Sequence, residues 1–230
     1  MMPSYLHNLS EKRRELLLRI VSALVMAPVA VACVVAGGEI YRALIVALGV
    51  GMAFEWRDIT RRPAERETGI GANVWTAAGW CYVTASMLAL LYVRESYGGL
   101  YRALFLAVCV WSTDVGAFFV GRTLGGPKLA PSFSPKKTWS GLIGGAVCSA
   151  GAAWIMSRSL PISLSADLAV LWGAGLAVTA QIGDIAESWV KRVFGVKDSG
   201  RIIPGHGGLL DRMDGLNAAA IPFALLCPLG

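Results

Sequence analysis

The stretch LYRALFLAVCVWSTDVGAFFVG, residues 100–121, decides the fold class of this 230-residue chain. It carries only two charged side chains, Arg102 and Asp114. A bilayer core about 30 Å thick requires roughly 20 apolar residues per helix, so this stretch predicts a membrane-spanning helix. Six other stretches approach its length and composition: 16–36, 40–56, 72–93, 139–157, 167–187 and 207–229. The sequence therefore predicts an all-α polytopic membrane protein of about seven transmembrane helices, or more if a half-helix or re-entrant segment is hidden.

The composition supports this class. The chain is 55% hydrophobic and 16% charged, whereas soluble domains carry about 25% charged residues. Its mean hydropathy of +0.57 excludes a disordered chain, a collagen-like repeat and a secreted disulfide scaffold. All five cysteines lie in apolar stretches, where thiols act as small hydrophobic side chains, so we expect no zinc site. They are Cys33, Cys81, Cys109, Cys148 and Cys227.

The net charge of +6 is a topology signal rather than a sign of a nucleic-acid partner. Seventeen of the 21 basic residues lie in the N-terminal segment or around three polar connections, 57–71, 122–138 and 188–206. The other four are Arg42, Arg94, Arg102 and Arg158. By the positive-inside rule, the N-terminus and the three connections are predicted to be cytoplasmic and the C-terminus to lie outside. This places the polar helix ends of an integral membrane protein toward the cytoplasm.

The two halves of the chain differ in kind. Residues 1–105 form an N-terminal region of transmembrane helices with no pattern that predicts a reaction, and 106–230 form the catalytic region. The charged segment 9–15 reads either as a topology anchor or as an amphipathic helix on anionic lipid. Asp114 lies well inside an apolar span, where an acid costs about 2.5–3.5 kcal/mol. We expect it to face a polar cavity, although a hydrogen bond between packed helices would also explain it.

Residues 121–141, GRTLGGPKLAPSFSPKKTWSG, have the composition of a polyphosphate-binding loop. Glycines allow close backbone approach to an anion, and lysines and hydroxyls supply charge and hydrogen-bond donors. The Walker A pattern is absent. The loop alone is equally consistent with an ordinary basic cytoplasmic connection. Its candidate phosphate ligands are Arg122, Lys128, Ser134, Lys136, Lys137 and Thr138.

The segment 183–214, GDIAESWVKRVFGVKDSGRIIPGHGGLLDRMD, favours a catalytic site. If 175–194 is helical, one face of that helix carries Asp184, Glu187, Ser188 and Lys191. Asp211 and Asp214 stand three residues apart where the last span begins. Carboxylates with substrate phosphates suit Mg²⁺, whereas internal salt bridges to Lys191, Arg192 and Arg212 are the structural alternative. His206, set among glycines, is either a phosphate or proton donor or a loop-shaping residue.

These residues resemble the phosphatidate cytidylyltransferases, or CDP-diacylglycerol synthases. The family pattern Ser-x2-Lys-Arg-x4-Lys-Asp is met at 188–198, and Pro-Gly-His-Gly-Gly-x2-Asp-Arg-x-Asp is met without a gap at 204–214. Upstream, Asp114, Gly116, Ala117, Gly121 and Arg122 match a second motif, and 134–139 matches a third. The resemblance covers roughly 110–215. It departs from the family at Ser140, where Glu is usual, and in having fewer spans than the family's fold.

The resemblance implies transfer of CMP from CTP to phosphatidate, giving CDP-diacylglycerol and pyrophosphate in phospholipid biosynthesis. It further implies Mg²⁺ and a homodimer among membrane lipids. Nucleotidyl transfer between two polyanions also leaves room for a second cation in a two-metal arrangement. The predicted catalytic residues are Asp184, Lys191, Arg192, Asp211 and Asp214. Further phosphate ligands are Ser188, Lys197 and His206. The metal ligands are Asp184, Asp211 and Asp214, with Asp198 and Asp114 as additional candidates.

Three alternatives compete with this interpretation. A CTP-dependent polyprenol or phytol kinase would transfer the γ-phosphoryl group, but the complete 204–214 match argues against it. A cation-coupled transporter would use Asp114 and Asp184 within the membrane, although the acids cluster at one edge. A CDP-alcohol phosphatidyltransferase needs a different aspartate spacing, which this chain lacks.

Overall fold

The computed structural model describes residues 21–22, 24–64, 69–200, 202–203 and 207–226, and most of these residues are helical. A short apolar helix, Leu24–Ala36, precedes the six numbered helices. These are α2 (Gly38–Thr60), α3 (Ala72–Glu95), α4 (Gly99–Leu124), α5 (Trp139–Ser159), α6 (Ala166–Val193) and α7 (Leu210–Leu226). The predicted helical class is confirmed. Four helices, α3 to α6, are long and apolar enough to cross a membrane, while the start of the predicted 16–36 span lies outside the described residues.

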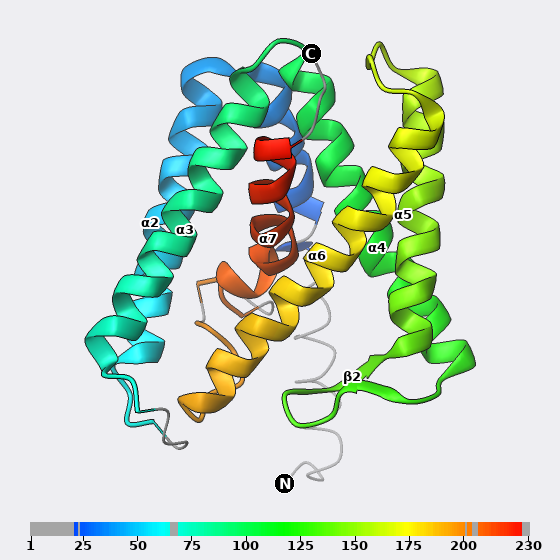
Figure 1. The fold of residues 1–230 in the computed structure, drawn as a ribbon. Coiled ribbons are helices and arrows are strands. Elements are labelled where there is room, and N and C mark those ends of the chain that lie inside the picture. Colours follow the sequence, from blue (N-terminus) through cyan, green and yellow to red (C-terminus); the bar gives the residue numbers. More distant parts are fainter. Residues whose placement is uncertain (1–20, 23, 65–68, 201, 204–206, 227–230) are drawn as a thin grey trace, which may run out of the picture.

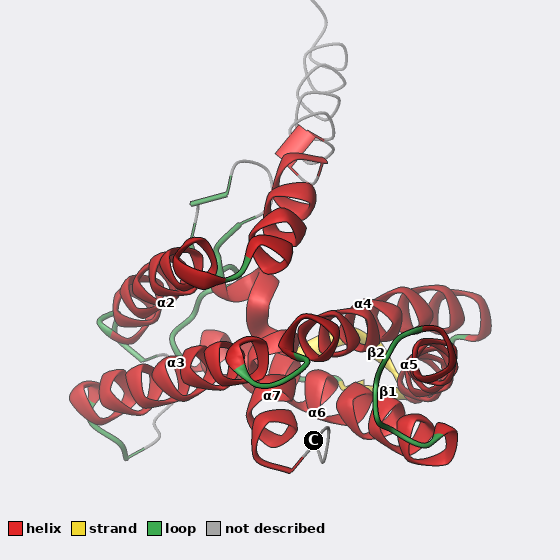
Figure 2. Cartoon of the chain, turned by 90° about the horizontal axis from the view of Figure 1, so that it is seen from above, coloured by secondary structure: helices red, strands yellow, loops and turns green. Residues whose placement is uncertain are grey.

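The helices form two outer groups around a central one. Figure 1 shows α2 and α3 on one side, α4 and α5 on the other, α6 running obliquely between them and α7 in the middle. The view from above in Figure 2 shows the same separation of the two groups. The turn after α2, the end of α4 and the end of α6 lie at one end of the molecule (Figure 1). The polar connections therefore meet at a single end.

Aromatic packing fixes α7 in the centre. The ring of Phe223 on α7 stacks on Phe105 of α4, with centroids 5.9 Å apart. Trp172 of α6 meets the same Phe223 ring edge-on at 5.7 Å. Phe105 and Phe223 are fully buried. Such aromatic pairs contribute about 0.5–1.5 kcal/mol beyond their buried area, so three helices are tied together at one point.

Small residues bring α4, α5 and α6 close together. A Cβ at Gly145 of α5 would lie 2.9 Å from the carbonyl oxygen of Thr113 on α4, so only glycine permits this approach. Ser149 Oγ of α5 donates a hydrogen bond to the Gly173 carbonyl oxygen of α6 at 2.8 Å. Many large apolar side chains of these helices are exposed at the outer surface, including Phe119, Ile143 and Leu171. This pattern is typical of helices that face lipid.

The polar connection 122–138 contains secondary structure that was not predicted from the sequence. Its residues form a small antiparallel hairpin of β1 (Lys128–Ala130) and β2 (Ser134–Thr138), with Lys128 opposite Thr138. Thr138 then caps α5, because its Oγ1 accepts the backbone N–H of Gly141 at 3.1 Å. The hydroxyl of Ser140 donates to the carbonyl oxygen of Gly125. The hairpin is thereby anchored at both the end of α4 and the start of α5.

The connection 188–206 is also shorter than expected, because α6 continues through its first residues to Val193. The helix assumed over 175–194 is therefore confirmed. At the opposite end of the molecule, basic side chains have structural partners. Arg94 Nε donates to the Val34 carbonyl oxygen at 2.6 Å, and Arg42 pairs with Glu95 at 2.5 Å.

Candidate active site

One face of α6 carries the polar side chains that the helical spacing predicts. Ser188 Oγ donates to Asp184 Oδ1 at 3.3 Å, and Lys191 Nζ donates to Glu187 Oε1 at 3.2 Å, both one turn apart. Glu187 and Lys191 are only 4% and 7% exposed. Buried charges are tolerated when they are paired and hydrogen-bonded. This stripe is therefore an organised polar seam inside an otherwise apolar bundle.

The seam continues to the start of α7 through Asp211. Lys191 Nζ lies 2.5 Å from Asp211 Oδ1. The other oxygen, Asp211 Oδ2, accepts backbone N–H groups from Ser199 at 2.8 Å and Gly208 at 3.1 Å. Both carboxylate oxygens of Asp211 are therefore engaged within the protein. Asp211 holds the loop 194–209 against α6.

A second lysine reaches the seam from the hairpin. Lys137 Nζ on β2 lies 2.5 Å from Asp184 Oδ2 on α6. The two side chains are 16% and 32% exposed, so this pair is more accessible than the Lys191 pair. Lys137 Nζ itself is buried, but both residues line the cavity described next, so an anion bound there would meet this pair. The contact connects the predicted phosphate-binding loop directly to the predicted catalytic helix.

A cavity of about 630 Å³ lies beside this pair, between the hairpin, α4, α5 and α6. Ligand sites in proteins typically measure about 300–1,000 Å³, so the volume suits a nucleotide. Four basic side chains line the cavity together with two acids, and an excess of positive charge favours a polyphosphate. Its polar lining consists of Asp114, Arg122, Lys128, Lys136, Lys137, Thr138, Gln181 and Asp184.

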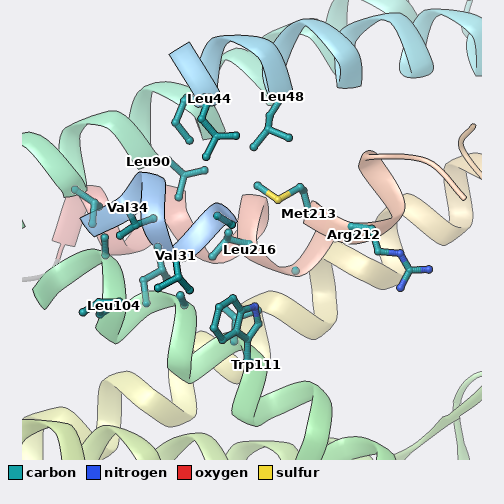
Figure 3. Close-up of a pocket in the computed structure, with 18 of the residues that line it drawn as sticks. Val31, Val34, Leu44, Leu48, Leu90, Leu104, Trp111, Arg212, Met213 and Leu216 are labelled. Atoms are coloured by element: carbon teal, nitrogen blue, oxygen red, sulfur yellow. The ribbon is translucent and has the colours of Figure 1, made fainter. Parts of the chain in front are cut away.

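A second, mainly apolar cavity of about 170 Å³ lies between the helix 24–36, α2, α3, α4 and α7. Figure 3 shows Val31, Leu44, Leu104 and other aliphatic side chains around it, with Arg212 to one side. Its charged lining residues are Asp114, Arg212 and Asp214. Asp114 lines both cavities. The expectation that Asp114 faces a polar cavity is consistent with this position, where the cationic and apolar spaces meet.

Other predicted residues lie further from the cavities. Arg192 Nη1 donates to the Val196 carbonyl oxygen at 2.7 Å, which stabilises the end of α6. Ser134 is half-buried on β2, whereas Lys197 and Asp198 are exposed in the loop after α6. His206 lies outside the described residues. Their assignments to phosphate or metal binding stay predictions.

The acidic residues supply the oxygen donors that Mg²⁺ prefers. Within the described part of the chain, no three Asp, Glu, His or Cys side chains are placed to hold one metal ion together. Asp184 nevertheless acts electrostatically on both Asp114 and Asp214, and Glu187 Oε2 is buried without a hydrogen bond. A magnesium ion commonly takes one or two carboxylates and completes its shell with water and substrate phosphates. The donor set fits that arrangement better than a closed protein site.

The sequence interpretation missed one residue, Glu55 of α2, because it assigned no chemistry to residues 1–105. Its carboxylate is only 4% exposed and accepts the backbone N–H groups of Leu209 at 3.0 Å and Leu210 at 2.9 Å. It therefore contacts the segment that carries Asp211 and Asp214. A signal was available, because Glu55 is an acid inside a predicted span, the same feature that drew attention to Asp114.

Comparisons with known proteins agree with these motifs. A model described as the cytidylyltransferase family matches residues 70–229. A phosphatidate cytidylyltransferase of Brucella suis is 39% identical over 242 residues, covering 88% of this chain and 89% of the relative. One from Rickettsia bellii is 34% identical, covering 90% and 88%. A Staphylococcus haemolyticus relative with the same name is 47% identical over 141 residues, covering 60% and 54%.

Proposed function

We propose that this chain, which belongs to the cytidylyltransferase family, transfers CMP from CTP to phosphatidate and releases pyrophosphate. Relatives named phosphatidate cytidylyltransferase match nearly its whole length. The observation that carries the proposal is the meeting of two unlike cavities at Asp114. One is cationic and suits a nucleotide triphosphate. The other is apolar with charged groups among its lining, which suits part of an acyl chain below a phosphate headgroup.

The reaction requires two anionic substrates to approach each other. An oxygen of the phosphatidate phosphate attacks the α-phosphorus of CTP, a new P–O bond forms, and the bond to pyrophosphate breaks in line. Such transfers depend on positioning and charge neutralisation more than on covalent catalysis. Because the nucleophile is already an anion, no strong general base is required. The protein must instead supply fixed cations on both sides of the reacting phosphorus.

Lys137 is placed to supply one of these cations. In the structure its ammonium neutralises Asp184, and an incoming phosphate would compete for the same group. Lys128, Lys136 and Arg122 line the rest of the cationic cavity and would bind the β- and γ-phosphates. Arg212 lines the apolar cavity and would face the lipid phosphate. The residues that would bind the phosphates of CTP thus line one cavity, and the residue that would bind the lipid phosphate lines the other.

Asp184 and Asp214, with Asp114 beside them, are the residues that would hold Mg²⁺ and any second cation. When bound, the ion neutralises charge on the triphosphate and on the leaving pyrophosphate. Asp211, whose oxygens are taken by Lys191 and the loop, would hold the loop in place beside the ion. Asp214, one turn further along α7, lines the cavity itself.

The reaction also requires access from two phases. CTP is soluble, and phosphatidate is confined to the bilayer. The arrangement of basic residues supports a chain of about seven transmembrane helices in a bacterial inner membrane with the hairpin and loop 194–209 at the cytoplasmic face. A homodimer, suggested by the family resemblance, is part of the same proposal.

The decisive experiment uses purified protein in detergent with phosphatidate, Mg²⁺ and CTP labelled at either the α- or the γ-phosphate. We expect the α label to enter the lipid and the γ label to leave as pyrophosphate. Transfer of γ label to lipid would instead establish a kinase. Transport in proteoliposomes without nucleotide consumption would favour the transporter alternative. Omitting Mg²⁺ should abolish lipid labelling, and restoring it should recover the rate.

A further inference from the structure

The carboxylate of Glu55 lies at the point where α2 meets the loop before α7. It accepts three hydrogen bonds, from the backbone N–H groups of Leu209 and Leu210 and from the hydroxyl of Ser199 at 3.2 Å. These donors lie about 150 residues away in sequence. The first N–H groups of a helix have no partner within the helix, and an anion there is favoured by the helix dipole. Glu55 thus caps α7 from a different helix.

The loop is shaped to admit this carboxylate. A Cβ at Gly208 would lie 2.7 Å from both Glu55 carboxylate oxygens, and one at Gly200 would clash with Oε1. Neither glycine has a positive φ, so backbone conformation does not require glycine at these two positions. Glycine is required there because a side chain would not fit. Gly200 is therefore accounted for by Glu55, and Gly208 by Glu55 together with the Ser199 hydroxyl, with which a Cβ there would clash.

Glu55 and Asp211 hold the same loop from opposite sides. Ser199 donates its hydroxyl to Glu55 and its backbone N–H to Asp211 at 2.8 Å. Asp211 in turn pairs with Lys191 of α6. A continuous set of contacts thus runs from α2 through Ser199 and Asp211 to α6. Moving any one group changes where α7 begins, and with it the position of Asp214.

We propose that Glu55 is a positioning residue for the cytidylyl transfer: its charge fixes the start of α7 and so places Asp211 and Asp214 for the reaction. The inference rests on the proposed function of that site. Glu55 touches neither of the two substrate cavities. Among the residues that the structure describes, it forms no ion pair with Lys or Arg. Within the described part of the chain, its charge is balanced by two backbone N–H groups and the Ser199 hydroxyl.

The test compares Glu55→Gln with Asp58→Asn, which removes the charge of an exposed acid one turn further along the same helix. Glutamine keeps the size of Glu55 but cannot accept at both oxygens. Turnover is measured with α-labelled CTP and divided by the amount of folded protein. That amount is taken from the monodisperse peak in size-exclusion chromatography and checked by the melting temperature. We expect Glu55→Gln to lower kcat at least 10-fold and raise the Mg²⁺ concentration for half-maximal rate, because the start of α7 loses a charge-assisted hydrogen bond. KM for CTP should stay within about threefold of the wild-type value. Asp58→Asn should behave as the wild type.

A mutant cycle separates positioning from general destabilisation. Gly200→Ala should reduce kcat because its methyl group meets Glu55. In Glu55→Ala the methyl group has room, so adding Gly200→Ala should cost little more, and the two effects should be clearly less than additive. Glu55→Asp, which keeps the charge, should recover part of the rate lost in Glu55→Ala.

The outcomes distinguish the two levels of the proposal. Wild-type protein that labels no lipid would overturn the proposed function itself. An active wild type with Glu55→Gln that has unchanged kcat and Mg²⁺ response per folded molecule would overturn the role of Glu55 alone. Loss of activity that only follows loss of folded protein would also overturn it, because a purely structural contact predicts that result. Additive effects in the cycle would overturn it too, because they would mean that the Gly200 methyl group does not act through Glu55.

Discussion

Two lysine–aspartate pairs of equal length each include one residue of α6, and they differ in almost everything else. Lys137 and Asp184 are 2.5 Å apart, as are Lys191 and Asp211. The first pair is up to 32% exposed and lines the cationic cavity. In the second, each side chain is at most 10% exposed and Asp211 also accepts two backbone N–H groups. The same type of ion pair can therefore either be available to a substrate or fix a loop in place, depending on its burial and its other hydrogen bonds.

The largest expected effect comes from neutralising the two aspartates separately. Asp184→Asn should lower kcat/KM at least 100-fold while the melting temperature in detergent stays within a few degrees. Asp211→Asn should lower activity and stability together, because breaking one partner of a buried pair costs about 3–5 kcal/mol. Thermal melts and lipid labelling on the same preparations check both expectations. Equal melting temperatures for the two variants would break the distinction between the pairs.

A smaller effect is expected from Lys137→Ala. Its removal takes one charge-assisted contact from the triphosphate, worth about 1.5–3 kcal/mol, so KM for CTP should rise roughly 10- to 100-fold. Lys137→Arg should retain most of the affinity because it keeps the charge. Initial rates over a CTP series at fixed phosphatidate provide the measurement. An unchanged KM for CTP, with kcat alone reduced, would place Lys137 at the lipid phosphate instead.

The smallest expected effect belongs to Ser140, which joins the hairpin to the end of α4 through the Gly125 carbonyl oxygen. Ser140→Ala removes a hydrogen bond worth about 0.5–1.5 kcal/mol. We expect a two- to tenfold rise in KM for CTP as the hairpin becomes less fixed, with kcat nearly unchanged. Thr123→Ala, which loses only a hydrogen bond to its own helix, serves as the control. Matching effects in the two variants would show that the hairpin anchor is unimportant.

The sequence predicted those features that local spacing determines. Helical periodicity was sufficient to place Asp184, Glu187, Ser188 and Lys191 on one face, and the contacts along α6 confirm it. Apolar length was sufficient to identify the four long spanning helices. The hairpin at 128–138 was not predicted, because its strands are short and contain proline and lysine, which are uncommon in strands.

Contacts between segments far apart in the sequence could not be predicted from residue spacing. The residues next to Glu55 in the sequence do not indicate that Leu209 and Ser199 are its hydrogen-bond partners. Likewise, residue type and spacing predicted the same role for Asp211 and Asp214, whereas the structure surrounds Asp211 with protein donors and leaves Asp214 lining a cavity. Such differences depend on three-dimensional packing and not on residue type.

The capping of α7 by Glu55 has a consequence for how the protein is made. During synthesis α2 is made well before α7, so for that interval the Glu55 carboxylate lacks the N–H groups of Leu209 and Leu210. An acid on an apolar helix is unfavourable until it finds hydrogen-bond partners, and the arrival of α7 supplies them. Docking of the last helix is therefore driven in part by a charge made first, and the loop ahead of α7 takes its form only when both helices are present.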